Sequence, residues 1–320
     1  MPYATHARRI APGTVRRAET VQPGMSGPNA LFVGRVGDWT WETVSEVCDV
    51  DAFRARDAGG RPSYLAFTYY RVMATPGTHP GLLQFGDRLD VVSQVFGAGG
   101  QSVLTVHRIH PASPGGRPLD DGPLTPEEIY ERRRPDCIYV ENFNSWISRG
   151  DSGANTELVR SCPPGFAFRH LPKLSARHSP RTALRAARRL RRVGDPEAEG
   201  RIPISPPLTH LQPVDLTRDV NGAGLLYFAS YFSVADAALL GLWRHLGRSD
   251  RQFLHRAVTD ARMCFVANTD PETVLRTRLQ AWSPAGDRRD ELVDIVIEDA
   301  RDARLLAVCS LRLATPPRAT

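Results

Sequence analysis

The chain has 320 residues, and its charged and apolar fractions, 24% and 41%, are typical of a soluble globular protein with room for two domains. The net charge of +6 is carried almost wholly by arginine, because Lys173 is the only lysine. Such a basic surface suits anionic partners. The five cysteines lie far apart without CxxC spacing, which argues against a disulfide framework and against a zinc site.

Residues 1–24 are polar, rich in arginine and interrupted by proline, so we expect an N-terminal arm that is poorly ordered at its start. They do not pair a basic cluster with a long apolar run, which is the pattern of a signal peptide. We therefore expect a cytoplasmic protein that does not bind membranes.

Residues 25–148 are predicted to form a first unit of one helix and a set of strands. Asp38 is a plausible N-cap for the helix, with Glu42 in its first turn. An irregular insert at 110–135 interrupts the unit and could form part of a lid. Strand-like runs follow the helix at 62–74, 88–96, 101–109 and 137–147.

Residues 149–212 are predicted to form a linker, because Pro-Pro and Pro-Gly pairs break regular structure. One helix is predicted within it, from Ser179 to Val193, with Pro180 in its first turn. A narrow apolar stripe runs along this helix, and the rest of its surface is arginine, including Arg181 and Arg185.

Residues 213–320 are predicted to form a second unit around a helix that is apolar nearly all the way round and therefore belongs inside a protein. A short strand is predicted at 225–230, and Ser233 and Asp236 have the spacing of a capping box. Four strand-like runs follow, and they alternate well between apolar and polar residues. They lie at 258–268, 273–282, 291–298 and 304–313.

The two units show a weak internal match, in which the pair Leu31-Phe32 corresponds to the pair Leu226-Tyr227. The predicted fold class is α+β, a double hot dog in which each curved antiparallel sheet wraps around one helix. The units should pair as pseudo-subunits, and a further homodimer stays open.

Helix N-termini are the first candidates for chemistry, because their free amides and positive dipole suit a developing oxyanion. These positions are 37–41 in the first unit and 231–235 in the second. Asn221 and Gly222 precede the second helix, where a small backbone permits close approach of a ligand. The alternative is that this glycine-rich stretch is only a tight entry loop.

Two further features have open interpretations. Asn142 and Asn144 share one face of a predicted strand with Trp146, where they could donate to a ligand or hydrogen-bond across the seam between the units. The arginine-rich run at 169–192 could contact the phosphates of coenzyme A, dock an acidic carrier protein, or be a solvated linker helix. Nucleic acid is not an expected partner, because no known nucleic-acid motif accompanies the run.

Three segments carry a family resemblance. DVNGAGLLYFASYFSVADAA, RPSYLAFTYYRV and YVENFNSWISR resemble the double hot dog proteins of polyketide biosynthesis, the family of the methylmalonyl-CoA acyltransferase/decarboxylase of the leinamycin pathway. Asp219, Asn221, Gly222 and Tyr227 are more distantly similar to a motif of acyl-CoA thioesterases. The histidine of that motif is missing here and the spacing differs, so thioesterase chemistry is in doubt.

The resemblance implies that methylmalonyl-CoA is decarboxylated and that the propionyl group passes to the phosphopantetheine thiol of an acyl carrier protein. It implies a tyrosine nucleophile, best matched by Tyr64, with Tyr69 and Tyr70 as competitors. A phenol is a weak nucleophile at neutral pH. Arg61, Arg71 or a histidine such as His107 could activate it.

No metal or organic cofactor is expected, since preformed donors at the thioester oxygen suffice for decarboxylation. The rival hypotheses are a hot dog thioesterase or dehydratase and a non-catalytic acyl-binding module. The residues expected to bind the CoA thioester, besides those at the reacting centre, are Asp38, Trp39, Thr40, Asn142, Asn144, Tyr227, Arg181 and Arg185.

Overall fold

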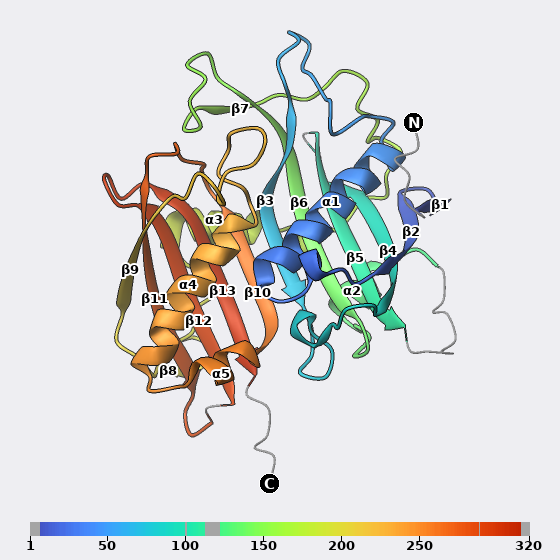
Figure 1. The fold of residues 1–320 in the computed structure, drawn as a ribbon. Helices are drawn as coiled ribbons and strands as arrows, with labels where there is room; N and C mark the ends of the chain where they lie inside the picture. Colours follow the sequence, from blue (N-terminus) through green and yellow to red (C-terminus); the bar gives the residue numbers. More distant parts are fainter. Residues whose placement is uncertain (1–6, 100, 113–121, 288, 315–320) are drawn as a thin grey trace.

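The computed structural model describes residues 7–99, 101–112, 122–287 and 289–314. One large sheet dominates it, with the strand order β1-β2-β4-β5-β6-β3-β10-β13-β12-β11-β8, while β7 pairs with β6 and β9 pairs with β11 (Figure 1). Every pair of these described strands is antiparallel.

The first unit contains the helix α1 (Asn29–Val47) and six strands of the sheet. The strands are β1 (Arg8–Ala11), β2 (Thr14–Thr20), β3 (Tyr64–Met73), β4 (Arg88–Gly97), β5 (Ser102–Ala112) and β6 (Ile138–Arg149). Residues 8–20, assigned to the N-terminal arm from the sequence, thus extend the sheet through the pairing of β2 with β4.

The second unit repeats this arrangement around α4 (Ser230–His245), which is followed by the short helix α5 (Asp250–Leu254). Its strands are β8 (Arg201–Pro203), β9 (Leu208–Pro213), β10 (Ala257–Phe265), β11 (Val274–Pro284), β12 (Asp290–Asp299) and β13 (Leu305–Ala314). The order β4-β5-β6-β3 of the first unit corresponds to β11-β12-β13-β10 of the second. The predicted double hot dog fold is therefore confirmed.

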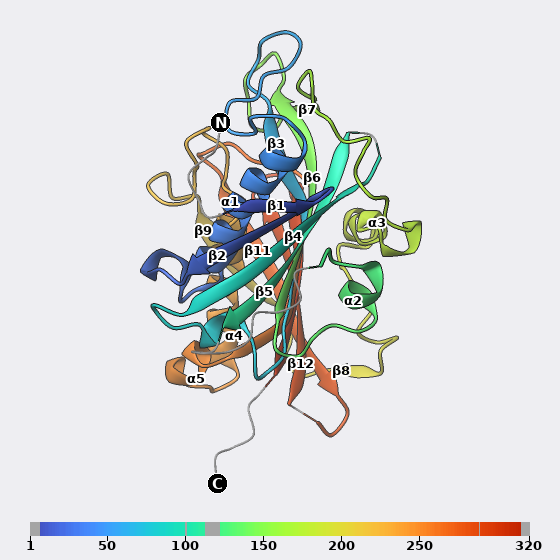
Figure 2. The same cartoon turned by 90° about the vertical axis from the view of Figure 1, so that its right-hand side faces the viewer.

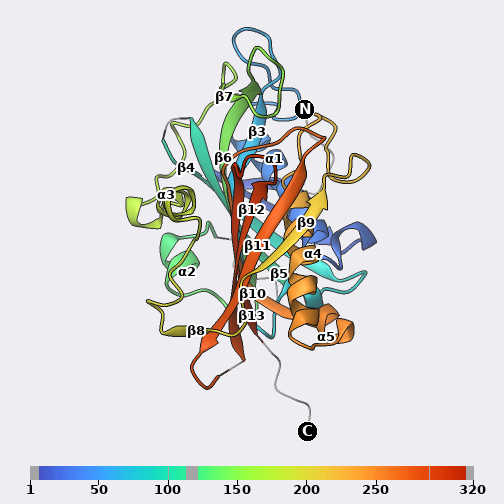
Figure 3. The ribbon, with the colours of Figure 1, turned by 90° about the vertical axis from the view of Figure 1, so that its left-hand side faces the viewer.

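The two central helices lie on the same face of the sheet and contact each other (Figure 1). They share one continuous apolar core, which includes Phe32 and Val36 from α1 and Val234 and Leu239 from α4. Figures 2 and 3 show α2 (Pro126–Tyr130) and α3 (Arg181–Leu190) on the opposite face. The remaining elements are β7 (Leu158–Arg160) and the single turns Pro23–Met25, Pro80–Leu82 and Ala176–His178.

Both central helices begin earlier than their capping signals predicted. Pro28 is the N-cap of α1, so Asp38 lies inside the helix and its predicted capping role is wrong. Ala229 is the N-cap of α4, so Ser233 already lies in the helix and the predicted capping box is wrong. In both cases the periodic apolar residues that the helix buries extend before the polar signal, and this burial determines where the helix starts.

Two other expectations need correction. The predicted strand at 225–230 is a turn, apart from one isolated bridge between Val220 and Leu226, and it leads directly into α4. Leu31 and Phe32 lie within α1, whereas Leu226 and Tyr227 precede α4, so the two pairs are not equivalent. Of the predicted insert at 110–135, residues 113–121 lie outside the described residues.

The seam between the units is the pairing of β3 with β10, from Tyr69 opposite Cys264 to Met73 opposite Asp260. Arg71 and Arg262 face each other directly across it, and both bind Asp260. Arg71 donates to its carboxylate at 2.6 and 3.0 Å, and Arg262 at 2.9 and 3.2 Å. One carboxylate therefore bridges two arginines where the units join.

None of the described helices has the length and apolar character needed to cross a membrane.

Replacing Asp260→Asn should destabilise the protein by about 3 kcal/mol, because two partly buried arginines lose their counter-charge. The free energy of unfolding in urea measures this loss. Burial alone would raise the pKa of Asp260, but hydrogen bonds and charge from Arg71 and Arg262 outweigh it and lower the pKa to about 2.

This native pKa lies below the unfolded value of about 3.9. The stability difference between the two proteins should thus be complete above pH ~4 and shrink as the pH falls toward the native pKa. Asp250→Asn is the control, since Asp250 forms an exposed ion pair with Arg244 and should matter little. An equal effect of both substitutions would contradict the role given to Asp260.

Candidate functional site

A cleft of about 730 Å³ opens at one end of the seam, with walls from both units. It exists because β3 is longer than its pairing with β10: residues 64–68 continue beyond the last pair. At Thr68 the register between β3 and β6 shifts, and the Thr68 hydroxyl donates to the Phe143 carbonyl at 3.0 Å. A bulge bends a strand locally, so the units separate at this point.

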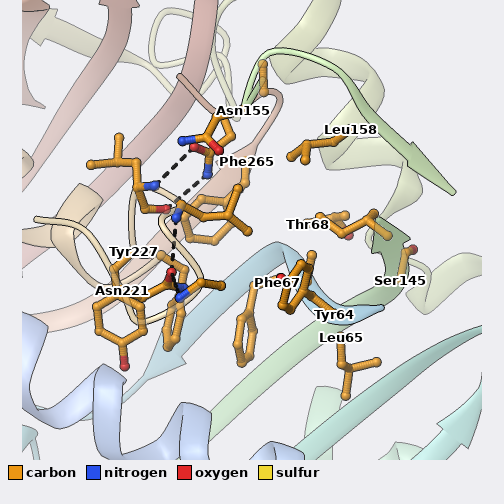
Figure 4. Close-up of a pocket in the computed structure, with 18 of the residues that line it drawn as sticks. Tyr64, Leu65, Phe67, Thr68, Ser145, Asn155, Leu158, Asn221, Tyr227 and Phe265 are labelled. Atoms are coloured by element: carbon orange, nitrogen blue, oxygen red, sulfur yellow. Dashed lines mark hydrogen bonds between the residues drawn. The ribbon is translucent and has the colours of Figure 1, made fainter. Parts of the chain in front are cut away.

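Figure 4 shows how the two walls face each other, with Tyr64, Phe67 and Thr68 from β3 on one side and Asn221 and Tyr227 on the other. Aromatic rings close the inner end. Phe67 and Phe228 meet across the seam with ring centroids 4.1 Å apart. The lining combines apolar and aromatic side chains with several polar and charged ones, which is a character that small-molecule sites share.

The second unit's wall is a loop that its own side chains and the first unit hold rigid. The Asn221 side chain accepts from the backbone N–H groups of Ala223 and Leu225 at 3.0 and 3.1 Å. Arg149 of β6 donates to the Ala223 carbonyl at 2.5 Å, and Asn155 donates to the Gly224 carbonyl at 2.7 Å. Asn221 therefore shapes the loop, while the loop itself lines the cleft, so both sequence interpretations of this stretch have structural support.

The first turn of α4 carries free donors at the cleft. The Ser230 N–H donates to the Tyr227 carbonyl, and the Phe232 N–H donates to the Ala229 carbonyl. Phe228 and Tyr231 line the cleft, and their N–H groups have no acceptor among the described residues. Tyr231 lies inside the expected range 231–235, and Phe228 lies just before the N-cap of α4. Within that range, Phe232 and Ser233 both donate to the Ala229 carbonyl. In α1 the range 37–41 is helix interior, so it offers no free first-turn amides.

Tyr64 is the one of the three candidate tyrosines that lines the cleft. Its hydroxyl has no hydrogen-bond partner among the described residues, whereas Tyr70 is buried and donates to the Val33 carbonyl at 3.0 Å. Tyr69 lies on the opposite face of the sheet from Tyr70, and burial raises its pKa far above the usual value. Of the three, the Tyr64 phenol alone is open to a ligand.

Two arginines that the sequence did not single out accompany Tyr64. In register, Tyr64 of β3 lies beside Ile147 of β6, which lies beside Arg160 of β7. Arg160 and Arg188 both line the cleft, and neither forms an ion pair within the described residues. The cations proposed from the sequence are engaged elsewhere: Arg61 with Asp57, Arg71 with Asp260, and His107 inside the first unit.

Asp38 and Tyr227 also line the cleft and add two ionisable side chains to it. Burial raises the pKa of Asp38, and the charge of Arg35 opposes this shift. Burial, with a contribution from the Asp38 charge, raises the pKa of Tyr227 to about 12. Asp38 is therefore a cleft residue although its capping role is wrong.

The remaining predicted residues do not line this cleft. Trp39, Thr40, Asn142 and Asn144 are fully buried inside the first unit. The Asn142 amide donates to the Thr40 hydroxyl of the same unit at 2.6 Å, so the expected hydrogen bond across the seam is wrong. Arg181 and Arg185 lie on α3, where Arg181 donates to the Ala98 carbonyl and Arg185 to the Thr182 hydroxyl.

Fold and cleft together define a double hot dog protein with one composite site between its halves. Residues 16–195, more than half of the chain, match the family model described as the LnmK N-terminal Hot Dog Fold domain. The chain belongs to this family.

Solved structures with the same fold are distant in sequence. A Lactobacillus plantarum protein described as an oleoyl thioesterase is 10% identical, with a TM-score of 0.56 over 95% of this chain and 97% of that one. The 12:0-ACP thioesterase of Umbellularia californica is also 10% identical, with a TM-score of 0.55 over 94% and 93% of the two chains. These similarities establish the fold alone. No curated protein matches the chain significantly.

Gly37→Ala should destabilise the protein. A methyl group at Gly37 would collide with the ring of Phe228 and push it away from Phe67. Thermal unfolding measures the effect. Gly241→Ala is the control, because this glycine also lies inside a central helix but faces open space. That substitution should stabilise the protein by ~0.5–1 kcal/mol. Stabilisation by both would contradict the close packing at Gly37.

Proposed function

We propose that the protein is an acyltransferase and decarboxylase that takes methylmalonyl-CoA and passes a propionyl group to the phosphopantetheine thiol of an acyl carrier protein. The observation that carries the proposal is the unpartnered Tyr64 phenol, which shares a cleft with two unpaired arginines and with free helix-terminal amides. Membership of the hot dog family supports the same class of thioester substrate.

In the proposed transfer, the Tyr64 oxygen attacks the thioester carbonyl carbon and the CoA thiolate leaves. A tyrosyl ester results, which the carrier's thiol then cleaves, and this restores the phenol. Arg160 and Arg188 line the same cleft and supply positive charge that attracts the anionic substrate. The amides of Phe228 and Tyr231 are the proposed donors to the oxyanion that forms at the carbonyl oxygen.

The same amides serve decarboxylation in this proposal. When the carboxylate is turned out of the plane of the carbonyl, loss of CO2 leaves an enolate whose oxygen accepts from these donors. A proton added to the α-carbon then completes the propionyl thioester. The step needs no electron acceptor, since the electron pair of the broken bond stays in the enolate.

The carrier protein is proposed to dock on α3. Arg181, Arg185 and Arg188 follow one another at intervals of four and three residues, which places them along one side of the helix. Arg188 of this row lines the cleft, so the row leads to its mouth. The helix is a fixed support, because Leu184 and Ala187 are buried and Arg191 pairs with the buried Glu298. A carrier protein with acidic helices would complement this surface.

Tyr64→Phe should lower the rate of acyl transfer by ~10³ or more with the fold intact, because the variant lacks the nucleophilic oxygen. Mass spectrometry of the carrier protein measures transfer. Tyr69→Phe is the control, since Tyr69 is buried away from the cleft and its variant should retain transfer. Retained transfer in Tyr64→Phe would refute the assignment. Release of free propionate or methylmalonate in place of transfer would favour a thioesterase, and unchanged thioester would favour an acyl-binding module.

Reversing Arg185 and Arg189 together to glutamate should weaken transfer to the carrier protein about tenfold or more, through its KM, and spare decarboxylation of the free CoA thioester. Both side chains are exposed on α3, and neither lines the cleft. The control reverses Arg54 and Arg251, which are exposed elsewhere on the surface. Docking on α3 is wrong if carrier transfer and decarboxylation fall equally, or if the control pair has the same effect.

A further inference from the structure

The interiors of the two units differ in polarity although their strands correspond. Under α4, the inner face of the second unit's sheet is mostly apolar and is formed by residues such as Leu279, Val293, Ile295 and Leu311. Its buried polar residues are Thr277 in the middle of β11 and Ser283 and Glu291 at one end of the sheet. Under α1, the corresponding face of the first unit carries buried polar side chains. They are Thr40 from the helix, Ser93 from β4, Thr105 and His107 from β5, and Asn142, Asn144 and Ser148 from β6.

The deeper half of this polar group is fully hydrogen-bonded. Ser93 bonds His107 Nδ1 at 2.7 Å, and His107 Nε2 bonds the Thr40 hydroxyl at 2.9 Å. The Thr40 hydroxyl donates to the Val36 carbonyl and accepts from Asn142 Nδ2. Burial, together with the charge of Arg17, lowers the pKa of His107 to about 3, so the ring is neutral near pH 7. This half is a satisfied structural network.

The other half contains polar atoms that lack a hydrogen-bond partner in the described part of the chain. Both amide atoms of Asn144, the Thr105 hydroxyl and the Trp146 ring N–H are buried without a hydrogen-bond partner among the described residues. Asn142 Oδ1 and the Ser148 hydroxyl share this condition. A buried amide costs free energy when it is unpaired, so a native protein keeps one where water or a ligand binds it.

These unpaired groups lie at the end of β6 that faces the cleft. Asn144 is the register partner of Phe67, and Trp146 is the register partner of Leu65, on the same face of the sheet. Leu65 and Phe67 both line the cleft. The Asn144 amide is therefore on the strand next to the cleft wall, beside Phe67.

We propose that Asn144, Trp146 and Thr105 form an inner arm of the cleft that binds the polar end of the acyl group, which in the proposed reaction is its α-carboxylate. This inference rests on the proposed function. The amide N–H, the indole N–H and the hydroxyl are uncharged donors to the two oxygens of a carboxylate. Ordered water satisfies them when no substrate is bound.

The chemistry of this arm suits decarboxylation. A carboxylate held by uncharged donors in an apolar surround is desolvated without a cation to stabilise its charge. Loss of CO2 removes that charge from the inner arm and moves the electron pair toward the thioester oxygen, where the α4 amides lie. The arm thus selects a carboxylated acyl group and also holds it in position for the bond to break.

The test compares binding of two CoA thioethers by calorimetry, 2-carboxypropyl-CoA and propyl-CoA, which lack the thioester and cannot turn over. Asn144→Leu in the full chain should weaken binding of 2-carboxypropyl-CoA about tenfold and binding of propyl-CoA less than about twofold, since one hydrogen bond to a charged group is lost. Thr277→Val is the matched control, because Thr277 is equally buried and unpaired in the apolar second unit. It should leave both affinities unchanged.

Asn144→Leu should fold with a Tm at least equal to that of the unsubstituted protein, because the Asn144 side chain makes no hydrogen bond to any residue that the structure describes. If Asn144→Leu does not fold, the two affinities are compared in Asn144→Ser instead. If Asn144→Leu loses affinity for both thioethers equally, or for neither, the proposal that the inner arm binds the carboxylate is wrong. These polar groups would then bind water alone. Failure of the unsubstituted protein to bind either thioether would instead overturn the acyl-CoA function itself.

Discussion

The site depends on one short strand pairing, the seam between β3 and β10. On the C-terminal side of the bulge at Thr68, β3 pairs with β10, and Asp260 binds Arg71 of β3 and Arg262 of β10. On the N-terminal side of the bulge the two strands separate, and the space between them is the cleft. A longer seam would close the cleft, and a weaker seam would let the two walls drift apart. Because both units contribute walls, neither hot dog unit forms the site alone.

The two units share a topology but divide the chemistry. The second unit contributes a helix end with free amides and the loop before it. Arg149, at the end of β6, and Asn155, just after it, hydrogen-bond to carbonyls of this loop. The first unit contributes Tyr64 and the polar interior around Asn144. The fold by itself specifies none of this, because equivalent positions in the second unit are apolar. The two halves therefore place different residues at the cleft, although their strands follow the same order.

Much of the fold could be predicted from local patterns. Strands with strict alternation, such as the one carrying Val293, Ile295 and Ile297, were predicted to within a few residues of their observed ends. The starts of both central helices were missed, because a polar residue with capping geometry in sequence, such as Ser233, has no effect when apolar burial extends the helix past it. The strand β2 was missed because Arg16 and Arg17 break its apolar pattern, yet Arg17 is buried against Glu42.

The site could be predicted only in part. Tyr64, Asp38, Asn221, Gly222 and Tyr227 do meet in one cleft. Arg188 falls in the arginine-rich run at 169–192 that the sequence did flag. Arg160, Arg149 and Asn155 were missed, because their positions follow from pairings across the sheet and across the seam that no local pattern encodes. Asn142 and Asn144 were recognised as unusual, but the side they face depends on the register of β6 with β3 and β5.

The most direct test of the central claim is to trap the acylated protein. The chain is incubated with methylmalonyl-CoA in the absence of a carrier protein, quenched at short times, digested and mapped by mass spectrometry. The account predicts a propionyl ester on Tyr64 that disappears when the carrier protein is added. A stable adduct on another residue, or transfer to the carrier without any adduct on Tyr64, would contradict it.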